Sequence, residues 1–117
     1  MGWFSKSDEN FFLSTVVPRG EGASVASYLG VVHGEAIIGA NIFRDMFSSI
    51  RDVVGGRAGG YERALSGARE AALEDMVAAA REMGADGIIG IDVDYEVLGE
   101  NNGMMMVAVS GTAVKMT

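Results

Sequence analysis

The chain has 117 residues, which is the length of one domain. Hydrophobic residues make up 49% of it and charged residues 21%, a balance typical of globular rather than disordered proteins. The net charge of −7 argues against nucleic-acid binding, and no run rich in Lys and Arg indicates an anionic membrane partner. The absence of Cys excludes disulfides, thiolate metal sites and a Cys nucleophile.

The first ten residues predict a flexible N-terminal arm, because Trp3 and Phe4 stand among Ser, Lys, Asp and Glu. This stretch lacks the long apolar region and the small-residue cleavage site of a secretory signal. No apolar run reaches the roughly 18 residues of a membrane span. We therefore expect a cytoplasmic protein in which residues 11–117 form a single domain.

Two strands are predicted in the first third of the chain. Residues 11–17 are rich in aromatic and β-branched side chains, and Pro18 ends that strand or places it at an edge. Residues 28–38 also have an extended pattern, with a break expected near Gly34. Neither face of this second stretch is wholly polar, so we expect burial on both sides or in an interface.

The middle of the chain predicts two amphipathic helices. Asn41 is suited to cap a helix over 42–54, in which apolar residues recur at helical spacing. A longer helix is predicted over 61–83, and Gly84 would end it. The apolar stripe of this longer helix is mostly Ala, so a neighbouring element can approach it closely.

The last third of the chain predicts an antiparallel hairpin. Residues 87–99 alternate between apolar and polar, residues 99–103 have turn chemistry, and residues 104–116 form the returning strand. Strands lie at both ends of the chain and helices lie between them. The predicted fold is therefore α+β, an antiparallel β-sheet with two helices packed on one face.

Three motifs carry a resemblance that covers about residues 13–116. They are GEAIIGAN at 34–41, RDMFSSIRDVVGGR at 44–57 and GADGIIGIDVDYE at 84–96. With these motifs the chain resembles the YbjQ-like family of small bacterial proteins of unknown function. The resemblance implies a dodecin-like or YbjQ-like α+β subunit that forms a ring-shaped homo-oligomer, a pentamer. It also brings the description "putative heavy-metal-binding", but no established activity.

The acidic strand is the first candidate metal site. Asp92, Asp94 and Glu96 occupy alternate positions of the strand predicted over 87–99, so their carboxylates point the same way. Such oxygen ligands suit a hard ion such as Ca²⁺, Mg²⁺ or Mn²⁺. The plainer interpretation is an ordinary solvated face of a half-buried sheet. Even so, the mutual repulsion of three aligned carboxylates has to be offset by a cation or by Arg from elsewhere.

A second candidate metal site combines His33 and Glu35, which also alternate onto one strand face. A His and a carboxylate can begin a Zn²⁺ or Mn²⁺ site, and in a ring each subunit would supply its own His33. The alternative is a hydrogen-bonded interface histidine. Soft heavy metals gain little support, because the only sulfur is in eight Met residues.

The glycine loop is a candidate anion site, formed by Gly55, Gly56, Arg57 and Tyr61 before a helix N-terminus. The loop is not a P-loop, because it lacks the Gly-Lys-Ser/Thr sequence that ends one. The alternative interpretation is a flexible hinge.

Two Arg–Asp pairs are candidate subunit-interface residues. Arg44 and Arg51 lie two turns apart on one face of the helix predicted over 42–54, and so do Asp45 and Asp52. In a cyclic assembly these faces could pair between neighbours. We favour this structural role over a catalytic pair of carboxylates.

Taken together, these features favour a non-enzymatic cytoplasmic homo-oligomer that binds a divalent metal ion or a small ligand. The alternative is a purely structural ring-shaped module that presents a surface to a protein partner. An enzyme is a third possibility, but the sequence holds no G-x-S-x-G motif and no recognisable Ser partner for His33.

Overall fold

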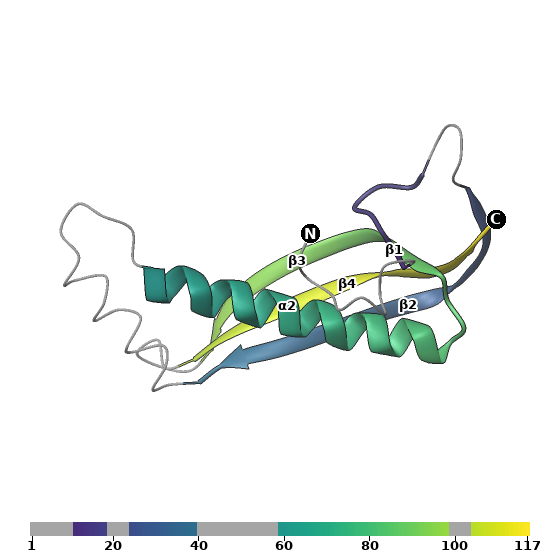
Figure 1. The fold of residues 1–117 in the computed structure, drawn as a ribbon. Helices are drawn as coiled ribbons and strands as arrows, with labels where there is room; N and C mark the ends of the chain where they lie inside the picture. Colours follow the sequence, from purple (N-terminus) through teal and green to yellow (C-terminus); the bar gives the residue numbers. More distant parts are fainter. Residues whose placement is uncertain (1–10, 19–23, 40–58, 99–103) are drawn as a thin grey trace.

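The computed structural model describes residues 11–18, 24–39, 59–98 and 104–117 (Figure 1). In chain order its elements are β1 (Phe12–Leu13), β2 (Val25–Ile38), α2 (Gly59–Glu82), β3 (Gly87–Leu98) and β4 (Met104–Met116). The hairpin of β3 and β4 and the long helix lie close to where the sequence predicts them. The strand predicted over 11–17 is much shorter, because only its first residues pair with a neighbour.

The four strands form one sheet in the order β1-β3-β4-β2. β4 lies in the middle and pairs antiparallel with both β2 and β3. β1 runs parallel to β3, with Phe12 opposite Gly87. The sheet is therefore mixed, and the prediction of an antiparallel sheet is wrong at this edge. β1 and β3 are far apart in the sequence, and the direction in which two such strands pair leaves no pattern in the residues of either strand.

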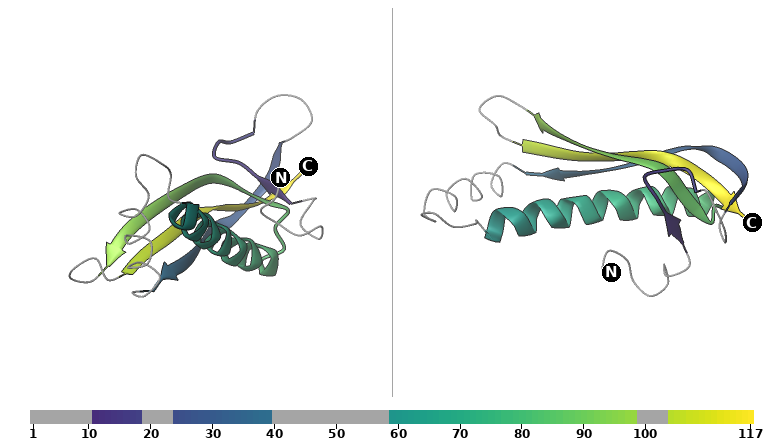
Figure 2. Two further views of the ribbon diagram at one scale, coloured as in Figure 1. Left: turned by 60° about the vertical axis from the view of Figure 1, so that its left-hand side comes forward. Right: turned by 90° about the horizontal axis from the view of Figure 1, so that it is seen from above.

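The prediction of two helices on one face is also wrong, since a single helix, α2, packs on the sheet in the described part of the chain. The first predicted helix, over 42–54, falls within residues 40–58, outside the described residues. α2 lies along one face of the sheet, and no described element covers the other face (Figure 2). No described helix is both long enough and apolar enough to span a membrane.

The core lies between α2 and the sheet. Its largest fully buried side chains are Leu73, Met76, Ile88, Val107, Val109 and Val114. On the helix side the core also uses Ala72 and Ala80, which are fully buried. These small residues let the helix backbone approach the sheet, as the Ala stripe predicts.

Gly34 is a point of close approach between α2 and β2. A Cβ added to Gly34 would lie 2.7 Å from the backbone nitrogen of Met76, closer than real Cβ contacts come, and 3.1 Å from the Cβ of Asp75, which is tight. The strand does not break there: β2 is continuous from Val25 to Ile38. Gly34 therefore serves close packing, and the predicted break at this position is wrong.

A β-bulge in β3 sets the direction of the acidic side chains. The register with β4 shifts between Ile89 and Asp92, and Gly90 adopts a φ of 63° in the left-handed region that favours glycine. Beyond the bulge, Asp92 lies opposite Ser110 and the strand alternates regularly to Leu98. The bulge thus determines which residues of β3 share a face with those of β2.

Candidate functional site

The outer face of the sheet, opposite α2, brings the two candidate metal sets together. His33 of β2 lies directly opposite Ser110 of β4, and Ser110 lies directly opposite Asp92 of β3. Directly opposite residues of antiparallel strands project to the same side of a sheet. His33, Ser110 and Asp92 therefore form one row across three strands.

A second row lies beside the first. Glu35 of β2 is opposite Ala108 of β4, and Ala108 is opposite Asp94 of β3. The five predicted ligands thus occupy one surface, with carboxylates on both sides of a middle strand that carries only short side chains in these rows. We call the residues His33, Glu35, Asp92, Asp94, Glu96 and Ser110 the outer-face cluster.

The five titratable members of the outer-face cluster are all exposed to solvent, and Ser110 is half-buried. Large apolar side chains flank them on β2, where Val31 is 75% exposed and Ile37 is 58% exposed. An apolar and charged surface of this kind is typical of an interaction face rather than of an inert one.

Electrostatic repulsion is concentrated on the acidic strand. The pKa of Asp94 is raised above its usual value, mainly because its side chain shares a hydrogen bond with Asp92 and faces the charge of Asp92, with Glu96 adding to the repulsion. A raised pKa in a carboxyl that is fully exposed reflects its charged neighbours more than burial. A cation placed on this strand would relieve that repulsion.

The outer-face cluster does not form a closed metal centre. Within the described ranges no three His, Asp or Glu side chains are grouped so that one ion could touch all of them. Pairs of ligands facing each other across β4 can hold an ion only with water or another subunit completing its coordination.

The YbjQ-like family, described as "Putative heavy-metal-binding", matches residues 12–117. The chain belongs to this family. Among solved structures it is similar to a protein of unknown function of the DUF74 family from Pediococcus pentosaceus, with a TM-score of 0.56 and 16% sequence identity. The similarity covers 93% of this chain and 100% of that one, and at this identity it shows the fold alone.

The other predicted site residues of this YbjQ-like chain belong to the anion site and the Arg–Asp interface. The interface residues Arg44, Asp45, Arg51 and Asp52, and the loop residues Gly55, Gly56 and Arg57, lie outside the described residues. Tyr61 falls within α2, but its side chain is not described. The anion site and the Arg–Asp interface therefore stay predictions.

Two contacts between α2 and the sheet escape sequence reasoning. The backbone N–H of Glu35 donates a hydrogen bond to a carboxylate oxygen of Asp75, 3.3 Å away. An Nη1 of Arg69 donates to the hydroxyl of Tyr95 at 2.8 Å. Both charged residues occupy the polar side of the predicted helix, and no feature of the local pattern distinguishes them from neighbouring solvated charges.

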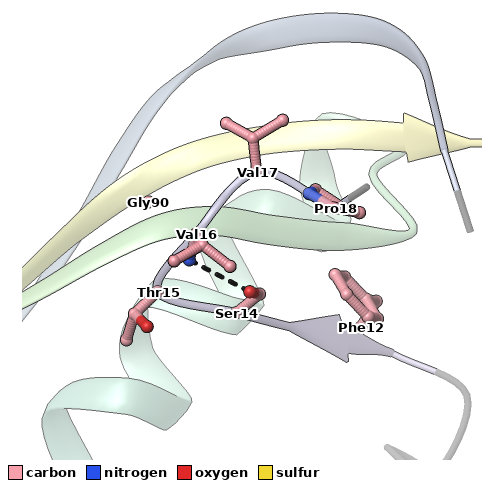
Figure 3. Close-up of a pocket in the computed structure, with 7 residues that line it drawn as sticks. All are labelled: Phe12, Ser14, Thr15, Val16, Val17, Pro18 and Gly90. Carbon is pink, nitrogen blue, oxygen red and sulfur yellow. Dashed lines mark hydrogen bonds between the residues drawn. The ribbon is translucent and has the colours of Figure 1, made fainter. Parts of the chain in front are cut away.

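A shallow apolar hollow lies beside the start of β3, beneath the segment that follows β1 (Figure 3). Its lining comprises Phe12, Ser14, Thr15, Val16, Val17, Pro18 and Gly90, around a volume of about 840 Å³. The N–H of Val16 donates to the hydroxyl of Ser14 at 3.0 Å, which shapes the turn above it. The lining holds no titratable side chain, so the hollow offers no acid–base chemistry.

Proposed function

We propose that this protein is a non-enzymatic homo-oligomer that binds a divalent metal ion on the outer face of its sheet. The observation that carries the proposal is the pair of rows in which His33 and Glu35 face Asp92 and Asp94 across β4. The family's description is consistent with a metal as the ligand.

The dimensions of the sheet allow an ion between β2 and β3. Neighbouring strands lie about 4.8 Å apart, so His33 and Asp92 are separated by about 9.6 Å at the backbone. Ser110 stands between them with a short side chain whose hydroxyl is a further oxygen ligand. Side chains reaching inward from both outer strands would then hold an ion above the middle strand.

The available donors select the class of metal. A soft heavy metal does not fit, because it prefers thiolates and the chain has no Cys. One imidazole and several carboxylates fit Mn²⁺ or Zn²⁺, and the carboxylates alone fit Mg²⁺ or Ca²⁺. With few protein ligands per ion we expect weak binding, with a dissociation constant of roughly 10⁻⁴–10⁻³ M for Ca²⁺.

Titration of Mn²⁺ into the purified protein, followed by its water-relaxation enhancement, tests this proposal. We expect saturable binding that Asp92→Asn combined with His33→Ala removes. Glu74→Gln is the matched control, because Glu74 is an exposed carboxylate of α2 on the opposite side of the sheet. If the double variant and the control bound Mn²⁺ equally well, the outer face would not be the metal site.

A purely structural ring-shaped module is the second candidate function, and the exposed apolar residues favour it. Val31 and Ile37 stand on the same face as His33 and Glu35 and leave apolar surface open to solvent. In this case the outer face would be covered by protein instead of an ion. Val31→Ser with Ile37→Ser would then dissociate the oligomer in sedimentation velocity, and the unsubstituted protein would show no saturable Mn²⁺ binding.

A further inference from the structure

The edge of β3 beyond the bulge has no strand beside it in the described part of the chain. Among the described residues, β1 pairs with β3 at Gly87 and Ile88, and the last backbone hydrogen bond on that side runs from the Ile91 N–H to the Ser14 carbonyl, at 3.2 Å. Backbone groups alternate in direction along a strand. The N–H and C=O groups of Val93, Tyr95 and Val97 therefore point away from β4, toward the open edge.

The opposite edge of the sheet is closed to pairing at its centre. The Glu35 N–H, which points away from β4, already donates to Asp75. The side chain of Asp75 reaches this edge because α2 packs closely against the neighbouring Gly34. An added strand at β2 would have to break the hydrogen bond between Glu35 and Asp75, so β3 offers the more accessible edge.

The two faces of the β3 edge differ in chemistry. On the outer side the edge presents Asp92, Asp94 and Glu96, all exposed. On the helix side, Tyr95 lies opposite the buried Val107 and Val97 lies opposite Met105. Tyr95 is 47% exposed and Val97 is 48% exposed, although Arg69 of α2 donates a hydrogen bond to the Tyr95 hydroxyl. The reason is that α2 lies mainly over β2, at the other side of the sheet (Figure 2).

We propose that the open edge of β3, from Asp92 to Leu98, binds an extended segment of a partner protein in which Lys or Arg alternates with apolar residues. The added strand would form main-chain hydrogen bonds with Val93, Tyr95 and Val97. Its basic side chains would lie beside the three carboxylates, because directly opposite residues share a face. Its apolar side chains would cover Tyr95 and Val97.

Charge makes a second copy of this chain a poor occupant of the edge. Pairing β3 with another β3 would place acidic side chains against acidic side chains, which is destabilising. Pairing β3 with β2 of another copy would bring Glu35 toward the same acidic row and meet the edge that Asp75 closes. The acidic row thus excludes acidic strands and favours basic ones.

The test uses a fluorescent seven-residue peptide, Lys-Val-Lys-Val-Lys-Val-Lys, and the full chain in excess chelator, so that metal binding plays no part. We expect saturable binding in fluorescence anisotropy that the Glu-for-Lys peptide lacks. Every second amide of the bound peptide would face β3, and N-methylation of these amides should abolish binding. N-methylation of the remaining amides, which would face solvent, should be tolerated. Purely electrostatic attraction would be insensitive to N-methylation, and that result would overturn the proposal.

Two proline variants localise the binding. Val97→Pro removes an N–H that faces the open edge, so the fold should survive while peptide affinity falls about tenfold. Val31→Pro is the matched control, since the Val31 N–H faces outward from β2 by the same alternation that directs the Glu35 N–H. Equal losses in both variants would overturn the proposal. Dissociation of the protein's own oligomer by Val97→Pro would also overturn it, by showing that a second copy already occupies the edge.

Discussion

The backbone N–H of Glu35 donates to the carboxylate of Asp75, which joins the exposed edge of β2 to the polar side of α2. This bond has two consequences. It orients Glu35 of the outer-face cluster by holding its backbone, and it occupies a donor that an added strand would need. The helix therefore protects one edge of the sheet while it packs against one face.

Replacing Asp75 tests this bond. Asp75→Ala keeps the Cβ near Gly34 but removes the acceptor, so we expect a loss of about 1 kcal/mol in the free energy of unfolding. The amide of Glu35 should exchange faster with solvent in hydrogen-exchange NMR. Glu74→Ala, at the neighbouring exposed position of α2, serves as the control and should change neither quantity. An unchanged exchange rate at Glu35 in Asp75→Ala would show that the bond has no effect in solution.

Close packing at Gly34 predicts opposite effects for two Gly→Ala substitutions. Gly34→Ala would drive a methyl group into the backbone of α2, so we expect a loss of about 1–3 kcal/mol in the free energy of unfolding. Gly67→Ala places its methyl in open space on α2 and should gain about 0.5–1 kcal/mol. Chemical denaturation of both variants measures the difference, and a stable Gly34→Ala protein would contradict the packing described.

The acidic strand predicts a pH dependence of stability. Asp94 has a raised pKa in the folded chain, so the folded state binds this proton more tightly than the unfolded state does. The free energy of unfolding should therefore rise as pH falls from neutral through the raised pKa toward the usual aspartate value of about 3.9, and gain nothing further from this group below that value. Thermal melts across this pH range measure the effect.

Asp94→Asn and added salt test whether charge repulsion at Asp94 causes this pH dependence. In the variant the free energy of unfolding should rise less as pH falls, because the group that takes up the proton is absent. High salt should reduce the rise in the unsubstituted protein, because it screens repulsion between exposed charges. A rise that persists in Asp94→Asn would assign the pH dependence to other groups.

The elements with strong local periodicity were predictable from the sequence. The alternation of Asp92, Asp94 and Glu96 with apolar residues predicts β3, and the Ala stripe predicts the close approach of α2. The parallel pairing of β1 was not predictable, because Phe12 and Gly87 are far apart in the sequence and carry no mark of strand direction. The role of Gly34 was misjudged because a glycine in a strand marks either a break or a close approach.

The candidate site was predictable as two separate sets but not as one surface. The alternation of His33 with Glu35, and of Asp92 with Asp94, follows from strand geometry alone. Their common face depends on the register of both strands with β4 and on the bulge at Gly90, which are properties of the folded sheet. The contacts of Asp75 and Arg69 depend in the same way on where α2 crosses the sheet.

A native mass spectrum of the purified protein, recorded with added Mn²⁺ and again after chelation, tests the central claim most directly. We predict a homo-oligomer whose mass exceeds the summed chains by a constant increment per subunit, and we predict that chelation removes the increment. The same spectrum of the Asp92→Asn, His33→Ala variant should show the oligomer at its bare mass. A bare mass in the unsubstituted protein, or an increment unchanged by the variant, would contradict metal binding on the outer face.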